Sequence, residues 1–259
     1  MSSLTLRLAL RLERYAPLRA EDKKALENEA PSLRRYLPRD NLARQGSPVE
    51  RIFMIIDGFA CRYKLLPDGR RQITAYLLPG DLCDTRTFSL PYMDHSIVAI
   101  SHVQAAALTE ESVQRLESLP GLARALARNS LVHQTIAREW QVNIGHRTSF
   151  ERLSHLLCEL FERLKMVGLA RDYTCEIPLT QTEIADTLAL SAVHVNRTLM
   201  ELRRAGLVTY RSKQLIIHDY PRLRDAAGFD PRYLGLAGAS PAIPAMPAIS
   251  VGVGGVLAE

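Results

Sequence analysis

The sequence predicts an α+β protein in which an N-terminal antiparallel jelly-roll barrel is followed by a long helix and a C-terminal winged helix-turn-helix. Apolar residues alternate at a period of two from about Leu33 to Leu108, and a helical period returns from about Pro120. Two short helices followed by two strands come next. We expect helices and barrel in residues 1–118, a dimerisation helix and hinge in 119–146, the winged helix-turn-helix in 147–234, and a flexible tail in 235–259.

The composition is that of a soluble protein with two domains. The chain has 259 residues, of which 47% are hydrophobic and 24% are charged, which is enough for two cores. The N-terminus alternates apolar residues with arginines and lacks the features of a secretory signal. No stretch is long and apolar enough to cross a bilayer, so we expect a cytoplasmic protein without a membrane partner.

The net charge and the cysteines exclude several classes. The formal charge is +5, but residues 147–233 are nearly balanced, so the bulk charge is weak evidence for a nucleic-acid partner. The four cysteines, Cys61, Cys83, Cys158 and Cys175, are scattered and form no C-x-x-C pair. This spacing argues against a disulfide framework and against a zinc or iron–sulfur site built on cysteine. We expect reduced thiols, no metal and no cofactor.

The barrel is predicted from alternating segments joined by turns. Between Phe59 and Leu65 the apolar side chains alternate with Arg62 and Lys64, and Gln72 to Tyr76 alternates in the same way. Pro67-Asp68-Gly69 between them favours a hairpin turn, because Pro presets φ and Gly accepts a positive φ. Before the barrel, the first thirty residues have helical spacing.

A helix of more than twenty residues is predicted from about Pro120 to the break at Gly145-His146-Arg147. It carries a stripe at spacings of three and four that resembles a coiled-coil seam with polar members. We expect this stripe to pair two copies of the chain, since so long a helix extends past a small barrel; packing on its own barrel is the alternative. The seam residues are Leu122, Leu126, Asn129, His133, Ile136 and Trp140, followed by Asn143.

The segment from Leu179 to Leu199 predicts a helix-turn-helix. Thr180 and Glu183 have the spacing of a capping box, and Ser191 is a good N-cap for the second helix. Two strands follow Gly206, with the basic turn Arg211-Ser212-Lys213 between them as a wing. From Arg197 to Lys213 there are five basic residues and one acidic residue. This local charge and the tight helix pair favour binding of double-stranded DNA over a plain helical hairpin.

At this point the sequence resembles the Crp/Fnr (cyclic-AMP receptor protein / fumarate-nitrate regulator) family of bacterial transcription regulators, over about residues 33–220. The resemblance is strongest in LTQTEIADTLALSAVHVNRTLMELRRAGLV, where the family shows T-x-x-E-I-A, S-x-x-x-V-x-R and L-x-x-x-G-L-[IV]. It implies an effector-binding barrel and a homodimer that places two recognition helices on a palindromic promoter site. RNA polymerase is then an expected partner.

The resemblance also implies contacts with DNA. Arg197 matches the family's base-reading arginine, and guanidinium on guanine is the commonest specific contact. Ala192 and Val193 fall at base-reading positions and are apolar here, and Asn196 can read adenine. The residues expected at the DNA backbone are Thr180, Gln181, Thr182, Ser191, His194, Arg211 and Lys213, with His194 equally suited to a base.

The effector is not defined by the sequence. The family's cyclic-nucleotide pocket uses a Gly-Glu pair and an R-[ST]-A, but the pair is absent here and His95 stands at the arginine position. A neutral imidazole does not replace a bidentate clamp on phosphate, so we expect no cyclic-AMP response. An unidentified small molecule, haem on His95 or His102, a thiol sensor at Cys83, and no ligand at all remain open. The pocket candidates are Asp81, Cys83, Thr85, Arg86, His95 and Ser96.

Two other classes compete with a regulator, and an enzyme is not expected. A cupin-like metalloenzyme also uses a jelly-roll barrel, but it needs closely spaced histidines with a carboxylate, and the barrel segment has only His95 and His102. A cyclic-nucleotide-binding signalling module without DNA activity is the second class. Arg197 and the basic wing argue against it.

Overall fold

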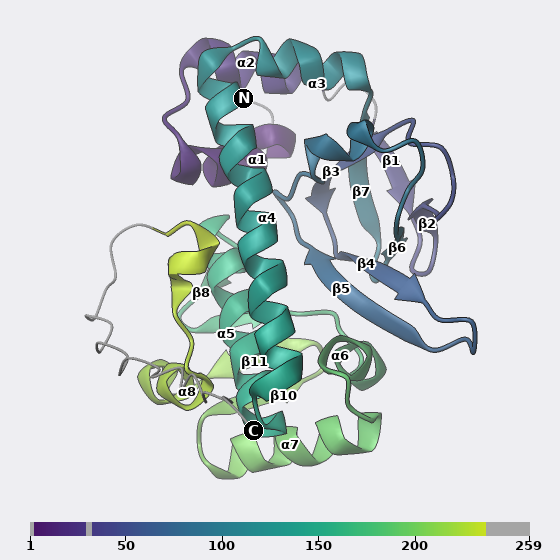
Figure 1. Cartoon of the computed structure of the whole chain (residues 1–259). Coiled ribbons are helices and arrows are strands. Elements are labelled where there is room, and N and C mark those ends of the chain that lie inside the picture. The colour runs from purple at the N-terminus through teal and green to yellow at the C-terminus, as the bar shows by residue number, and fades with distance from the viewer. Residues whose placement is uncertain (1–2, 30–32, 237–259) are drawn as a thin grey trace, which may run out of the picture.

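The barrel consists of two antiparallel sheets (Figure 1). The computed structural model describes residues 3–29 and 33–236. One sheet has the order β1-β7-β3, and the other has the order β2-β6-β4-β5. The predicted antiparallel barrel is therefore confirmed. The strands are β1 (Leu33–Tyr36), β2 (Asn41–Ala43), β3 (Ile52–Asp57), β4 (Ala60–Leu65), β5 (Arg71–Leu77), β6 (Ser96–Ala99) and β7 (Val103–Leu108).

The predicted turns join these strands. The turn between β4 and β5 contains Gly69 at φ +85°, in the left-handed region that glycine adopts without a Cβ clash. Gly58, between β3 and β4, has a stricter role, because a Cβ at that position would lie 1.9 Å from the carbonyl oxygen of His102. A glycine here allows the two backbones to approach and closes the barrel.

Helices cover one end of the barrel and connect it to the rest of the chain. α1 (Ser3–Tyr15) and α2 (Ala20–Asn28) precede the barrel, η1 (Thr85–Ser89) is a short 3-10 helix after β5, and α3 (Glu110–Glu117) follows β7. α1 buries Leu8 and Leu12 and packs on α4 (Pro120–His146). α4 has 27 residues and runs down the front of the molecule in Figure 1.

The predicted seam of α4 does not pair two copies of the chain, so this prediction is wrong. Other elements of the same chain cover the seam. Leu122, Leu126, Asn129, Ile136 and Trp140 are buried, and His133 is half-buried beside a cavity. The polar members find partners inside the chain: Asn129 donates to the carbonyl of Leu82 (3.3 Å) and Trp140 Nε1 donates to Glu159 Oε2 (2.9 Å). Periodicity located the stripe correctly but did not identify the element that covers it.

The C-terminal region contains the predicted winged helix-turn-helix. Its elements are α5 (Ser149–Met166), β8 (Ala170–Arg171), β9 (Thr174–Glu176), α6 (Gln181–Leu188), α7 (Ala192–Arg204), β10 (Val208–Arg211), β11 (Gln214–Ile217), α8 (Tyr220–Ala227) and η2 (Pro231–Leu234). Its sheet has the order β10-β11-β9-β8. The hairpin β8–β9 is an addition to the prediction.

The chain then returns to the long helix. Thr135 Oγ1 on α4 donates to the carbonyl of Tyr233 (2.6 Å), and the Tyr233 hydroxyl donates to Glu159 Oε2 on α5 (2.9 Å). η2 therefore attaches α5 to α4. The flexible tail expected in residues 235–259 lies, apart from Gly235 and Leu236, outside the described residues.

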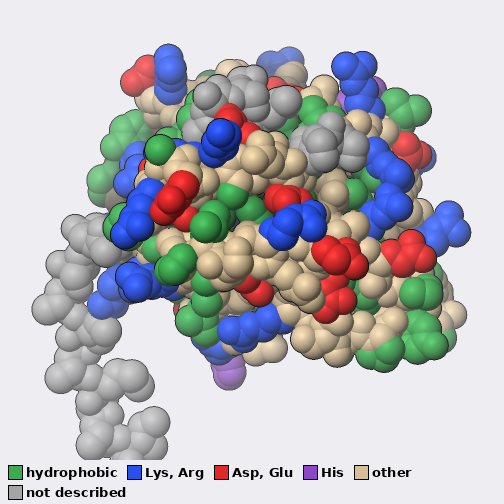
Figure 2. Space-filling view, turned by 90° about the horizontal axis from the view of Figure 1, so that it is seen from above, with side chains coloured by type: hydrophobic (Ala, Val, Ile, Leu, Met, Phe, Trp, Pro, Cys, Tyr) green, Lys and Arg blue, Asp and Glu red, His purple; other side chains and the backbone are tan. Residues whose placement is uncertain are grey.

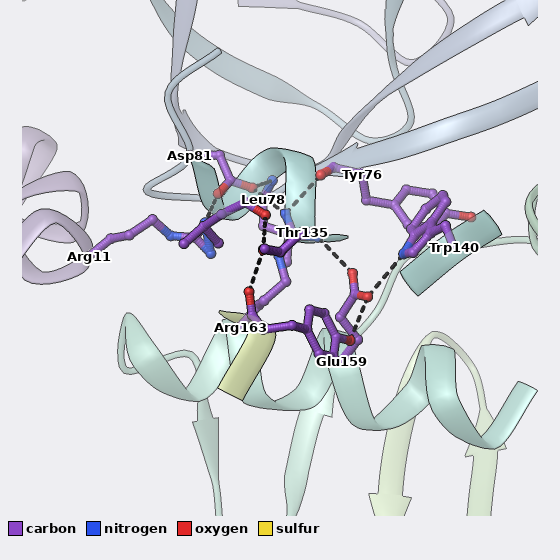
Figure 3. A network of polar contacts seen from close by, with 10 residues as sticks. Arg11, Tyr76, Leu78, Asp81, Thr135, Trp140, Glu159 and Arg163 are labelled. Atoms are coloured by element: carbon purple, nitrogen blue, oxygen red, sulfur yellow. Dashed lines mark hydrogen bonds and ion pairs between the residues drawn. The ribbon is translucent and has the colours of Figure 1, made fainter. Parts of the chain in front are cut away.

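A buried network of charges joins the barrel to the C-terminal region (Figure 3). Asp81, in the loop after β5, pairs with Arg11 of α1 and with Arg163 of α5 (2.7 Å to Arg163 Nη2). Arg163 also pairs with Glu159 (3.1 Å) and donates to the carbonyl of Tyr76 (2.8 Å). These charges compensate each other, so the network fixes the geometry of the junction. We name Arg11, Asp81, Glu159 and Arg163 the junction network.

Candidate nucleic-acid interface and sensor cavity

Side-chain caps fix the two helices of the helix-turn-helix. Thr180 and Glu183 form the expected capping box: Thr180 N donates to Glu183 Oε2 (2.7 Å), and Glu183 N donates to Thr180 Oγ1 (3.2 Å). Ser191 Oγ accepts from His194 N (3.2 Å) and caps α7. Ala189, in the connection, has φ +53°, which turns the chain between the helices.

α7 has one buried and one exposed face. Val195, Thr198 and Leu202 are buried against the rest of the domain. Asn196 and Arg197 are exposed on the other side, and Val193 is 81% exposed, an unusual position for a large apolar side chain. Ala192 is half-buried at the start of the helix. The four residues predicted to read bases thus lie on the first two turns, and three of them are exposed.

Some of the residues predicted to contact the DNA backbone already form hydrogen bonds within the protein. Thr182 is exposed and Gln181 is half-buried at the start of α6. The Thr180 and Ser191 side chains cap helices, as described above, and His194 Nε2 lies 3.0 Å from Ser149 Oγ on α5. His194 therefore has a structural partner before any DNA binds. Sequence reasoning missed this contact, which joins positions 45 residues apart.

The wing is a tight two-residue turn. Arg211 pairs with Gln214 across the hairpin, and Ser212 and Lys213 between them have φ +51° and +65°. Two consecutive positive φ values are the signature of a type I′ hairpin turn. Arg211 and Lys213 are both exposed at its tip.

The charge at this end of the molecule is one-sided. In the described part of the chain, no carboxylate pairs with any of Arg197, Arg203, Arg204, Arg211 or Lys213. The opposite end, seen from above in Figure 2, mixes basic and acidic side chains across its surface. A surface of unpaired cations is suited to a polyanion such as the DNA backbone.

The six predicted effector-pocket residues do not come together, which corrects that prediction. Asp81 is fully buried in the junction network, and Cys83 is buried beneath the barrel surface. Thr85 and Arg86 belong to η1 and face α3. Ser96 is buried, and its Oγ accepts from Gln45 N (3.0 Å). His95 alone among the six lines the cavity described next.

This cavity lies between the barrel and the helices α4 and α5. We name it the sensor cavity; its volume is about 260 Å³. Strands β4 and β5 form one wall, the turn before β6 contributes Asp94 and His95, α4 forms the opposite wall, and α5 contributes Arg163. The lining residues are Arg62, Lys64, Thr74, Ala75, Tyr76, Leu77, Asp94, His95, His133, Ile136, Ala137 and Arg163.

The thiols and histidines have surroundings that bear on redox and haem chemistry. Burial raises the pKa of Cys61 and of Cys175 to about 12, so neither is a thiolate near neutral pH. His95 Nδ1 lies 2.6 Å from Asp94 Oδ1, and burial, with the charge of Arg62, lowers its pKa. His102 is exposed. Among the described residues, no group of three His, Cys, Asp or Glu side chains is placed to hold a metal.

Comparison with known domains matches both halves of the chain. A model of the Crp-like helix-turn-helix domain matches residues 151–226, and a model of the cyclic nucleotide-binding domain matches residues 33–118. Within the described residues, no helix is long and apolar enough to cross a membrane.

Individual proteins give the same result. The nitrogen fixation regulation protein FixK of Bradyrhizobium diazoefficiens is 32% identical over 176 residues, which span 68% of this chain and 70% of the relative. The transcriptional activator protein FnrL of Cereibacter sphaeroides is 26% identical over 76% of this chain and 81% of its own length. The structure of FixK2 from Bradyrhizobium japonicum has a TM-score of 0.68 and 25% identity, and it covers 75% of this chain and 96% of that chain.

The fold and the exposed helix-turn-helix define a DNA-binding transcription regulator with a sensor-type barrel. The chain belongs to the Crp/Fnr family of bacterial transcription regulators. The family expected from the sequence is therefore confirmed.

Proposed function

We propose that the protein binds a palindromic promoter site as a homodimer, with the α7 helix of each copy in one of two successive major grooves. The exposed face of α7 carries this proposal, because Asn196 and Arg197 project from it without a partner in the described structure. Two such helices about one turn of DNA apart match a two-fold symmetric site. Two relatives are named transcriptional activators, which supports a role in regulating transcription. The protein would then act in the cytoplasm and contact RNA polymerase.

Each residue of this face has a proposed role. Arg197 binds O6 and N7 of a guanine, a contact worth about 1–3 kcal/mol of discrimination. Asn196 reads an adenine, and Val193 with Ala192 packs on thymine methyl groups. Gln181, Thr182, Arg211 and Lys213 contact the DNA backbone and hold the register, and Thr180, Ser191 and His194 support them near the phosphates.

Selection of genomic DNA fragments by the purified protein tests base reading. We expect the wild type to enrich a two-fold symmetric sequence at fixed salt. Arg197→Ala removes one guanine contact from each copy, so it should lower the preference for that sequence at least about 10-fold and keep weak, salt-sensitive binding. Arg19→Ala removes an equally exposed arginine at the far end of the molecule and serves as the control. An unchanged preference in Arg197→Ala would contradict the proposed base contact.

The homodimer is proposed to form through the outer face of α4, opposite its buried stripe. Ala127, Leu131, Gln134, Arg138 and Val142 follow one another at spacings of three and four and are exposed. Leu131 is 51% and Val142 is 45% exposed, and Figure 1 shows no element in front of this part of the helix. A second copy of α4 would cover these side chains, as helices do in a two-stranded bundle.

Sedimentation at several concentrations tests this face. Leu131→Glu places a charge in the proposed seam, so we expect dimer dissociation to increase at least about tenfold while the monomer stays folded. Leu65→Glu changes an equally exposed leucine on the barrel and should leave the dimer intact. If both variants remain dimeric, another surface joins the two copies.

We also propose that cyclic AMP is not the effector. The Gly-Glu pair is absent, and the family's clamp position is held by His95, whose lowered pKa keeps it uncharged near neutral pH. The binding experiment described below includes this nucleotide.

A further inference from the structure

Among the described residues that line the sensor cavity, one cation lacks a counterion. Lys64 Nζ lies 3.8 Å from Asp94 Oδ2, and Arg163 is compensated by Asp81 and Glu159 in the junction network. Arg62, on β4, lines the same cavity, and no carboxylate in the described ranges lies within ion-pair distance of it. The cavity thus has an excess of positive charge at Arg62.

Three of the residues that line this cavity carry a nitrogen atom without a partner in the described structure. Arg62 Nε, His133 Nδ1 and Arg163 Nε are buried, and none has a hydrogen-bond partner in the described structure. Buried polar atoms are almost always hydrogen-bonded, so three such atoms on residues that line one cavity point to a missing acceptor. Burial and the charges of Arg62 and Arg163 lower the pKa of His133 well below its usual value, which leaves a neutral ring in positive surroundings.

The rest of the lining limits what this acceptor is. Ala75, Leu77, Ile136 and Ala137 provide an apolar side. The volume of about 260 Å³ is below the roughly 300–1,000 Å³ typical of sites for drug-sized ligands. An anionic head group opposite Arg62 and a small apolar body against Leu77 and Ile136 would satisfy both sides.

We infer that the sensor cavity binds a small organic anion, with its carboxylate or phosphate on Arg62 and its apolar part between β5 and α4. The cation does not come from the position of the family's clamping arginine, which His95 holds in this chain. The lining includes Arg163 of α5, the first helix of the DNA-binding region. The ligand therefore occupies a space shared by the barrel and the DNA-binding region.

The cavity is also connected to the helix-turn-helix. Tyr76 lines it from β5, and the Tyr76 hydroxyl lies 2.5 Å from Thr187 Oγ1 and donates to the carbonyl of Glu183 (3.3 Å) on α6. Arg71, on the same strand, pairs with Asp186 of α6 (2.7 Å). A ligand that displaces Tyr76 thus alters the contacts that hold α6, and this step rests on the proposed DNA-binding function.

Titration calorimetry at constant ionic strength tests the anion site with benzoate and phenyl phosphate as probes. We expect saturable binding of both, no binding of neutral benzyl alcohol, and at least about tenfold weaker binding to Arg62→Gln, the loss expected for a charge-assisted hydrogen bond. Arg70→Gln removes an exposed arginine at the tip of the same hairpin and should bind like the wild type.

Three results would overturn the anion site. The first is that neither probe binds saturably to the wild type. The second is that the probes bind equally well to the wild type and to Arg62→Gln. The third is that cyclic AMP binds more tightly than both probes. Circular dichroism of Arg62→Gln confirms that a loss of binding is not a loss of folding.

DNA affinity with and without phenyl phosphate tests the connection separately. We expect the anion to change the affinity of the wild type for its selected site. Thr187→Val removes the α6 partner of the Tyr76 hydroxyl from outside the cavity, so it should bind the anion normally with that change reduced at least about threefold. An equal effect in both proteins would overturn the role of Tyr76. If the wild type selects no DNA site, the DNA-binding proposal fails while the calorimetric result stands alone.

Discussion

The junction network and the DNA-facing end of the molecule use the same residue types in opposite ways. At the junction, Arg11 and Arg163 are buried, and each pairs with Asp81. At the DNA-facing end, Arg197 and Lys213 are exposed and pair with no described carboxylate. Buried charge needs partners within the protein, whereas exposed unpaired charge is available to a ligand. The state of pairing, rather than the residue type, separates structural from binding residues here.

Removing one partner at the junction should have the largest effect. Asp81→Asn takes away the carboxylate shared by Arg11 and Arg163 and leaves two buried guanidinium groups undercompensated, so we expect a loss of about 3–5 kcal/mol in the free energy of unfolding. Urea unfolding at fixed protein concentration measures it. Asp57→Asn changes a carboxylate that is 62% exposed beside Arg7, and should cost less than about 1 kcal/mol. Equal losses would remove the distinction between the two regions.

Removing an exposed cation should leave folding unchanged and weaken DNA binding. Lys213→Ala at the wing tip removes one proposed phosphate contact from each copy of the homodimer, so the slope of log affinity against log salt should become shallower by about 1.8, which is 0.9 per contact. The loss should be the same on specific and random DNA, measured by fluorescence anisotropy at several salt concentrations. Lys24→Ala on α2 is the control. A slope equal to that of the control would place the wing away from the DNA.

The smallest expected effect concerns the connection between α6 and α7. Ala189 has φ +53°, a left-handed conformation that costs a residue with a Cβ about 1–2 kcal/mol. Glycine avoids this cost, but it also raises the entropy of the unfolded chain, which cancels part of the gain in stability. We expect Ala189→Gly to raise the free energy of unfolding by about 0.5 kcal/mol. Ala205→Gly, at the right-handed end of α7, should lower it by a similar amount. A loss in both variants would mean that the turn carries no strain.

Features determined by neighbouring residues could be predicted from the sequence. Thr180 with Glu183, and Ser191, cap helices as expected, because a cap depends on residues three positions apart. The hairpin at Asp172-Tyr173 was missed, because its second left-handed residue is a tyrosine and not the glycine that usually follows Asp in such a turn.

Features that depend on distant residues could not be predicted. The apolar stripe of α4 was located from its spacing, but the elements that bury it come from distant parts of the chain. The prediction therefore assigned a second copy of the chain as the cover. Asp81 pairs with a residue 82 positions away, and the sensor cavity combines residues from Arg62 to Arg163. Alternation placed Arg62 and Lys64 on a strand, but no local pattern indicated which of them would lack a counterion.

The return of η2 to α4 has a consequence for the order of assembly during translation. Tyr233 binds Glu159, and Gly235 lies so near Tyr15 of α1 that a Cβ at that position would be 2.9 Å from the tyrosine ring, so nearly the last described residues lie beside one of the first helices. A domain generally folds as its residues leave the ribosome, and the barrel is complete long before position 233 is synthesised. The attachment of α5 to α4 by η2 must form afterwards. A chain truncated before Tyr233 lacks this attachment even if each of its domains has folded.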